Sequence, residues 1–343
     1  MEQILKHRAE IYGLLAIWIM VFHLDRAYAM PNIPLLTNFV KCGNAGVDVF
    51  LFLSGYCLYL SLNRNSSVGN FFRKRFKRVV LVYLVIAIPF FLYKAFFETR
   101  TNIVLNFLYD LSGLSFWFDH CIDVWFVHAI ILFYIFTIPF YHMIKKGIGY
   151  GIALMILLFV VNYLGHEYLT IYNLYNKGSI GYIRILPFVF GMVIADAYNR
   201  YHLQERFQCM KQYSRALFSI ILIGCLVLYL AFDVKDFAFK RLHSVGMWLS
   251  YFPMILPFLS FFLLVAKLSF KVKCVYSFLH TVGIVSLEFY LIHVMVIHII
   301  RNQGLLNHLG ASVYIIVPLI TLPLSMAANK LSDMISNKLI ASK

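Results

Sequence analysis

The stretch GVDVFLFLSG, residues 46–55, lies in an apolar run long enough to cross a bilayer, yet it contains the carboxylate of Asp48. A helix needs roughly 20 apolar residues to cross a hydrocarbon core of about 30 Å. An ionisable side chain within such a segment is costly and usually faces the interior of a helix bundle or a water-filled cavity. The stretch therefore predicts a membrane-spanning helix that also carries a buried polar group.

The composition extends this prediction to the whole chain. Of the 343 residues, 62% are hydrophobic and 13% are charged, whereas about 25% of the residues in a soluble domain are charged. Runs such as FPMILPFLSFFLLV, residues 252–265, do not alternate as β-barrel strands would. We expect an all-α polytopic membrane protein that forms a single domain over residues 1–343. Ten spans are predicted: 11–30, 44–63, 79–98, 124–143, 147–165, 181–198, 214–232, 246–266, 281–301 and 310–328.

The distribution of basic residues predicts the orientation. With a cytoplasmic N-terminus, 20 of the 30 lysines and arginines fall on the inner side, as the positive-inside rule requires. Both termini are then cytoplasmic, and the first span remains as an anchor because no signal-peptide cleavage site follows it. The net charge of +15 is explained by topology and contact with anionic lipids, so nucleic acid is not an expected partner. We expect a multi-pass protein of a cell membrane, most simply a bacterial plasma membrane.

The six cysteines include no CxxC pair, so we predict no zinc or other metal site. Cys42 and Cys121 would both lie near the outer face, either as a disulfide or as two free thiols.

The first span carries His23 near its outer end. Position 12 lies eleven residues earlier, on nearly the same helix face and about 16 Å deeper, and Arg8 lies on the same side. A stripe from Arg8 through Tyr12 to His23 would therefore run from the cytoplasmic edge to the outer half of the membrane. Imidazole suits proton abstraction from a hydroxyl because its pKa lies near neutrality. Alternatively, His23 is an interfacial residue that is hydrogen-bonded to a neighbouring helix.

Further stretches follow His23 in a characteristic order and spacing. They are GVDVFLFLSGYCLYL (46–60), FFRKRFKRVVLVYL (71–84), DVWFVHAIILFYIFTIP (123–139), RILPFVFGMVIA (184–195) and SLEFYLIHVMVI (286–297). Taken together over essentially the whole chain, they resemble the acyltransferase-3 family. Members of that family are membrane-embedded enzymes that O-acylate glycans and related hydroxyl-bearing molecules.

The resemblance implies acyl transfer from cytosolic acetyl-CoA, or a similar thioester, to a hydroxyl at the outer face, with His23 as general base or acyl relay. The chain departs from the family in one respect. The usual first-span signature is an arginine or lysine, ten intervening residues and a histidine, but Tyr12 stands at the basic position. Arg8, one turn earlier, is expected to extend its guanidinium into the same region.

Asp48 lies in the outer part of the second span, near the predicted level of His23. We expect it to hydrogen-bond to His23, directly or through one water, and to orient the imidazole and raise its basicity. Alternatively, Asp48 stabilises the positive end of its own helix. Deeper in the same span, Gly55 is expected to allow close helix packing and Ser54 to line the reaction path.

The run RKRFKR, residues 73–78, lies at the cytoplasmic start of the third span. Arg73, Arg75 and Arg78 are candidates to bind the phosphates of acyl-CoA, because guanidinium groups pair with phosphate through two hydrogen bonds. Arg8 and Tyr12 complete the predicted donor site. Alternatively, the basic run 73–78 only anchors the helix at the inner face of the membrane, as the positive-inside rule predicts.

Acceptor contacts are predicted at the outer ends of the fourth and sixth spans. Asp123, Trp125 and His128 suit sugar recognition, although an interfacial tryptophan also anchors a helix. Arg184 could pair with Asp48 or Asp123, hold an anionic acceptor, or extend to the interface.

In the ninth span Ser286, Tyr290 and His293 form one polar stripe, which would line the donor channel or join helices.

The sequence thus favours a membrane O-acyltransferase, most simply an acetyl-CoA-dependent O-acetyltransferase of a cell-surface or lipid-linked glycan. A transporter or flippase-like protein is the alternative, in which the same buried histidine, aspartate and arginine side chains form a translocation site. A family member that has lost catalysis is another.

Overall fold

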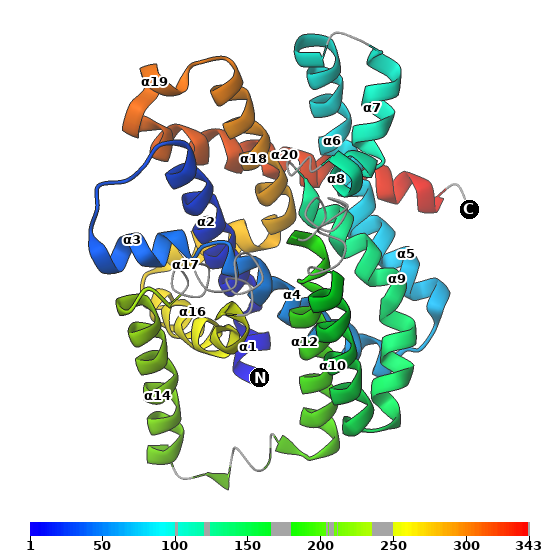
Figure 1. Cartoon of the computed structure of the whole chain (residues 1–343), viewed down its shortest axis with the longest axis vertical. Helices are drawn as coiled ribbons and strands as arrows, with labels where there is room; N and C mark the ends of the chain where they lie inside the picture. Colours follow the sequence, from blue (N-terminus) through cyan, green and yellow to red (C-terminus); the bar gives the residue numbers. More distant parts are fainter. Residues whose placement is uncertain are drawn as a thin grey trace. The chain divides into compact units, whose positions relative to one another are not determined.

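The structure is a computed structural model that describes residues 1–99, 102–119, 124–165, 180–203, 205, 209–210, 212–234 and 250–341. Every regular element in these ranges is a helix, as Figure 1 shows. This confirms the all-α class.

The chain divides into two compact units, each built from separate segments. The first unit comprises residues 1–65, 139–160 and 183–286, and the second comprises residues 66–138, 161–182 and 287–343. Each unit is described by itself, and the single domain over residues 1–343 stays a prediction.

The first unit contains the first two predicted spans. Its helices are α1 (Glu2–Lys6), α2 (Arg8–Ala27), α3 (Pro34–Lys41), α4 (Ala45–Arg64), α10 (Ile148–Leu164), α12 (Ile185–Arg200), α14 (Gln212–Ala231), α16 (Ile255–Ser269) and α17 (Lys273–Ile284), with the last turns of α9 (Trp125–Lys146). Figure 1 shows α4, α10 and α12 in one region, and Gly151 of α10 packs against Val193 of α12.

Glycines determine how closely the helices of this unit approach. A Cβ atom at Gly55 of α4 would overlap the backbone carbonyl of Phe188 in α12, and one at Gly191 of α12 would overlap the carbonyl of Phe52 in α4. Missing side chains allow such backbone contact between apolar helices. The close packing expected of Gly55 is confirmed. A second such pair joins α2 to α17, where a Cβ atom at Gly283 would overlap the carbonyl of Ala9.

The second unit is built around one long helical segment, residues 68–98. Its elements are α5 (Val68–Arg75), the π-helix η1 (Phe76–Val80), α6 (Leu81–Tyr93), the π-helix η2 (Lys94–Thr99), α7 (Ile103–Leu111), α8 (Leu114–Asp119), the first part of α9, α18 (Ser286–Asn302), α19 (Leu306–Leu309), η6 (Gly310–Ser312) and α20 (Val313–Ala341). α6 packs against α7 and α20. The π-helix η1 carries Lys77 and Arg78, and the π-helix η2 carries Lys94 and Glu98.

Six described helices are long and apolar enough to cross a membrane. They cover Ala45–Arg64, Val68–Glu98, Trp125–Lys146, Ile180–Arg200, Phe252–Ser269 and Leu306–Lys338. The predicted ninth span, 281–301, is instead divided between α17 and α18, which would make a seventh span if the two count together. The predicted spans 147–165 and 214–232 correspond to shorter apolar helices, Ile148–Leu164 and Ala216–Ala231. The total of ten spans and the cytoplasmic placement of the termini stay predictions.

Candidate functional site

Two deeply buried charges of the first unit, Asp48 and Arg184, are 3% and 1% exposed. Nε of Arg184 lies 3.7 Å from Oδ1 of Asp48, so the two charges attract each other without forming a hydrogen bond at that distance. Arg184 stands directly before α12 and Asp48 lies in the first turn of α4. Of the alternatives that the sequence leaves open for Arg184, the structure shows the pair with Asp48.

Asp48 retains one unused hydrogen-bonding atom. Its Oδ2 atom is buried and receives no hydrogen bond from any described residue. One turn earlier on α4, Oδ1 of Asn44 accepts a hydrogen bond of 2.8 Å from the hydroxyl of Tyr251. The polar end of α4 therefore combines a buried ion pair, a buried tyrosine and a free carboxylate oxygen.

The expected hydrogen bond between Asp48 and His23 is absent from the described structure. Gly46 of α4 faces Ile19 of α2, since a Cβ atom there would lie 2.9 Å from the Ile19 side chain. Asp48 follows two residues later, which turns it about 200° around the helix and away from α2. His23 lies one turn beyond Ile19, half-buried, with its ring 5.4 Å from the ring of Phe22. Asp48 thus faces Arg184 instead of His23.

The N-terminal end of α2, the helix that carries His23, brings Arg8 and Tyr12 together. Cζ of Arg8 lies 6.0 Å from the centroid of the Tyr12 ring, and Nη1 of Arg8 lies 3.8 Å from Sγ of Cys57 in α4. Tyr12 in turn packs on Phe50, with ring centroids 4.8 Å apart. A guanidinium group therefore lies over the residue that replaces the family's basic residue, as expected for Arg8.

The remaining predicted donor-site residues differ in how firmly they are held. Arg75 is half-buried and lies 5.9 Å from the ring centroids of both Phe71 and Tyr134. Arg73 and Arg78 are exposed, and Arg73 hydrogen-bonds to Asn70 at 3.2 Å. Arg73 and Arg78 are thus exposed residues of the second unit, whereas Arg75 packs against two aromatic rings. Ser54, predicted to line the path, is half-buried in α4.

The predicted acceptor residue Trp125 is buried at the start of α9, where it packs 6.5 Å from Phe116 and 6.1 Å from Phe126. Asp123 lies outside the described residues, as does Cys121, so the alternatives of a disulfide with Cys42 or two free thiols stay predictions. His128, one turn beyond Trp125, is also buried, and its Nε2 atom lies 3.0 Å from the hydroxyl oxygen of Tyr83.

The polar residues of α18 are turned inward, as the predicted stripe requires. Tyr290 packs edge-on against Phe126 at 5.3 Å and against His293 at 5.6 Å. His293 is fully buried, and its Nδ1 atom lies 2.8 Å from the carbonyl oxygen of Phe289. Since a carbonyl can only accept, Nδ1 of His293 must donate.

Sequence reasoning missed the polar clusters at Asp196 and at Glu98. In the first unit, Asp196 accepts hydrogen bonds from Tyr59 at 2.6 Å and from Arg200 at 2.9 and 3.1 Å. The i,i+4 spacing of Asp196 and Arg200 is a signal that could have predicted part of this cluster.

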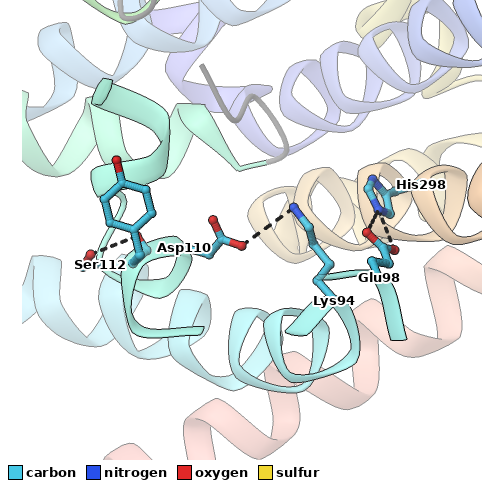
Figure 2. Close-up of polar contacts among 6 residues, drawn as sticks. Lys94, Glu98, Asp110, Ser112 and His298 are labelled. Carbon is cyan, nitrogen blue, oxygen red and sulfur yellow. Dashed lines mark hydrogen bonds and ion pairs between the residues drawn. The ribbon is translucent and has the colours of Figure 1, made fainter. Parts of the chain in front are cut away.

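The second missed cluster lies in the second unit, where Nε2 of His298 is 2.9 Å from Glu98 and Lys94 is 3.9 Å from Asp110 (Figure 2). Figure 2 shows both pairs at the η2 segment. Only tertiary contact joins residues 98 and 298, so no local pattern marks the first of these pairs.

The histidine and carboxylate side chains of these clusters can bind and transfer protons. Buried aromatic rings pack beside several of them. Within the described ranges, no group of three or more histidine, cysteine, aspartate or glutamate side chains is placed to hold a metal ion.

A family model described as an acyltransferase domain, that of the acyltransferase-3 family, matches residues 13–330, nearly the whole chain. No curated protein and no solved structure matches the chain significantly. The matched range includes His23, the Asp48–Arg184 pair and the buried residues of α9 and α18. The chain therefore belongs to the acyltransferase-3 family and is an acyltransferase with membrane-spanning helices.

Proposed function

We propose that this protein transfers an acyl group, most simply acetyl, from acyl-CoA to a hydroxyl of a cell-surface or lipid-linked glycan. The observation that carries the proposal is the layout of α2, whose residues from Gly13 onward lie within the matched domain. This helix holds a cation over Tyr12 near one end and His23 near the other. Eleven residues of helix separate Tyr12 from His23 by about 16 Å, so the helix can bring a donor arm and a base to one reaction path.

In this reaction the acceptor oxygen attacks the thioester carbonyl carbon while His23 takes the hydroxyl proton. The tetrahedral oxyanion then collapses, the carbon–sulfur bond breaks, and the imidazolium returns the proton to the thiolate. The products are the acyl ester and CoA thiol. Binding of the donor is proposed to use Arg8, Tyr12, Arg73, Arg75 and Arg78, and binding of the acceptor to use Asp123, Trp125 and Arg184.

Asp48 acts in this proposal by holding Arg184 in place, because the structure turns it toward Arg184. Ser54, Tyr290 and His293 are proposed to line the donor path. The membrane is proposed to be a bacterial plasma membrane.

The test is transfer of radiolabelled acetyl groups in inside-out vesicles supplied with labelled acetyl-CoA and a glycan extract. We expect labelled glycan with the wild type, a loss of at least about 100-fold in rate with His23→Ala, and no loss with His308→Ala, which changes an exposed histidine. Absence of transfer by the wild type would favour a transporter or an inactive family member. If wild type and His23→Ala transferred label equally well, only the proposed role of His23 as general base would be refuted.

A further inference from the structure

The hydrogen bonds around His128 define which of its ring nitrogens carries the proton. The hydroxyl of Tyr83 donates to the carbonyl oxygen of Leu111 at 2.8 Å, because a carbonyl can only accept. The same hydroxyl oxygen lies 3.0 Å from Nε2 of His128. With its proton committed to Leu111, Tyr83 can only accept from His128, so Nε2 carries the hydrogen.

A neutral imidazole has one N–H group, so Nδ1 of His128 presents a lone pair. The His128 residue is 8% exposed. Its Nδ1 atom is buried and has no hydrogen-bond partner among the residues that the structure describes. A buried acceptor without a partner is energetically costly, which is a reason to expect a ligand group there.

The ring of His128 is also fixed in orientation. Gly113, with φ +81°, places its backbone against the ring, and a Cβ atom there would lie 2.6 Å from it. Phe116 stacks on the ring with centroids 6.2 Å apart and an interplanar angle of 28°, and Tyr83 meets it edge-on at 5.3 Å. The lone pair of Nδ1 therefore points in one direction before any ligand binds, which reduces the ordering cost of binding.

We propose that Nδ1 of His128 accepts a hydrogen bond from an uncharged O–H or N–H group of a substrate, and that Tyr83 is the positioning residue that holds the required tautomer. The aromatic residues beside it suit a sugar, whose apolar face packs on rings while its hydroxyls hydrogen-bond. Phe116 lies 4.5 Å from Trp117, which packs 4.9 Å from Tyr182. The ligand group is therefore assigned to the acceptor hydroxyl. This assignment rests on the proposed function, and an amide N–H of the CoA arm is the other source of the same chemistry.

The first test needs no turnover. Protein labelled with ¹⁵N-histidine is placed in lipid nanodiscs, and the His128 signal is identified by its loss in His128→Asn. We expect a protonated Nε2 and a bare Nδ1 in the free protein. Octyl glucoside should shift the Nδ1 signal, while its tetra-O-methyl ether, which keeps the ring and the octyl chain but has no hydroxyl, should not.

Coenzyme A alone provides the second arm of this test. A shift of Nδ1 with coenzyme A and none with octyl glucoside would move the assignment from the acceptor to the CoA arm and keep the hydrogen-bond acceptor role. A protonated Nδ1 in the free protein, or no response to either probe, would overturn the proposal. Since no acyl transfer is measured, failure here is distinguishable from failure of the proposed function.

Three variants then distinguish the roles of Nδ1 and Nε2 of His128 in the transfer assay. An asparagine amide can replace Nδ1 in position, whereas a glutamine amide replaces Nε2. We expect His128→Gln and Tyr83→Phe to raise the acceptor KM about threefold to tenfold with the donor KM unchanged, and His128→Asn to raise it less. Tyr150→Phe is the matched control, because Tyr150 is exposed in α10. Equal acceptor KM values for the Gln and Asn variants would contradict the assigned nitrogen.

Discussion

At the scale of single residues, the buried ion pair of Asp48 and Arg184 should be more sensitive to loss of one partner than to loss of both. Removing one partner leaves an uncompensated buried charge, which costs about 3–5 kcal/mol. We expect Asp48→Asn and Arg184→Gln each to lower the melting temperature in detergent, and the double variant to recover part of the loss. A double variant whose loss equals the sum of the single losses would show that the two side chains are not coupled.

The cation over Tyr12 gives a prediction about the donor. Because the guanidinium of Arg8 lies over the ring of Tyr12, Tyr12→Phe keeps the aromatic face while Arg8→Ala removes the charge. We therefore expect Arg8→Ala to raise the acetyl-CoA KM more than Tyr12→Phe does. Lys6→Ala, which removes an exposed charge nearby, is the control for loss of general positive charge. An unchanged donor KM in Arg8→Ala would separate Arg8 from donor binding.

At the scale of helices, the contact between α4 and α12 depends on two glycines. Added Cβ atoms at Gly55 and Gly191 would overlap the backbone of the opposite helix, and overpacking of this kind costs about 1–3 kcal/mol. We expect Gly55→Ala and Gly191→Ala each to lower the melting temperature. Separation of the two helices should also weaken the Asp48–Arg184 pair, so acyl transfer should fall as well.

Gly224 in α14 is the matched control for these substitutions, because an added Cβ atom there meets nothing within 4 Å. Alanine is favoured over glycine in a helix interior by about 1 kcal/mol, so Gly224→Ala should leave the melting temperature unchanged or raise it. If Gly55→Ala left the melting temperature unchanged or raised it, as expected for Gly224→Ala, the result would contradict the close approach of α4 and α12.

Segment boundaries and pairings between segments differ in how far they could be predicted. The second span, predicted as 44–63, is found as Ala45–Arg64, because a continuous apolar run determines both the helix and its ends. Its packing partners come from other parts of the chain. The direction of Asp48 depends on which face of α4 meets α2, and that is decided at Gly46 and Ile19. A pattern read along one helix cannot supply this information.

The contacts of the candidate functional site could likewise be predicted only in part from the sequence. The sequence offers Asp48 as one of several possible partners of Arg184, because a buried charge requires an opposite charge. The chain of hydrogen bonds from Leu111 through Tyr83 to His128 left no such signal, since one member is a backbone carbonyl and the three residues are far apart in sequence. Composition predicted the helical class, while the division into two units follows from contacts between distant segments.

At the scale of the whole molecule, the basic residues predict that Lys273 and the start of α17 lie on the cytoplasmic side and that the end of α18 lies outside. Cys274 is an exposed native thiol at the start of α17, and Asn302 is exposed at the end of α18. In a variant without other cysteines, a membrane-impermeant maleimide should label Cys274 only in inside-out vesicles. Asn302→Cys should be labelled only in right-side-out vesicles.

This pair of positions also tests how α17 and α18 relate to the membrane. If the two helices together make one span, the two thiols must be labelled from opposite sides. Labelling of both from the same side would show that the segment enters and leaves the membrane on one face. The number of crossings would then change by one, and the C-terminal end of α20 would be expected on the outer side instead of the cytoplasmic side.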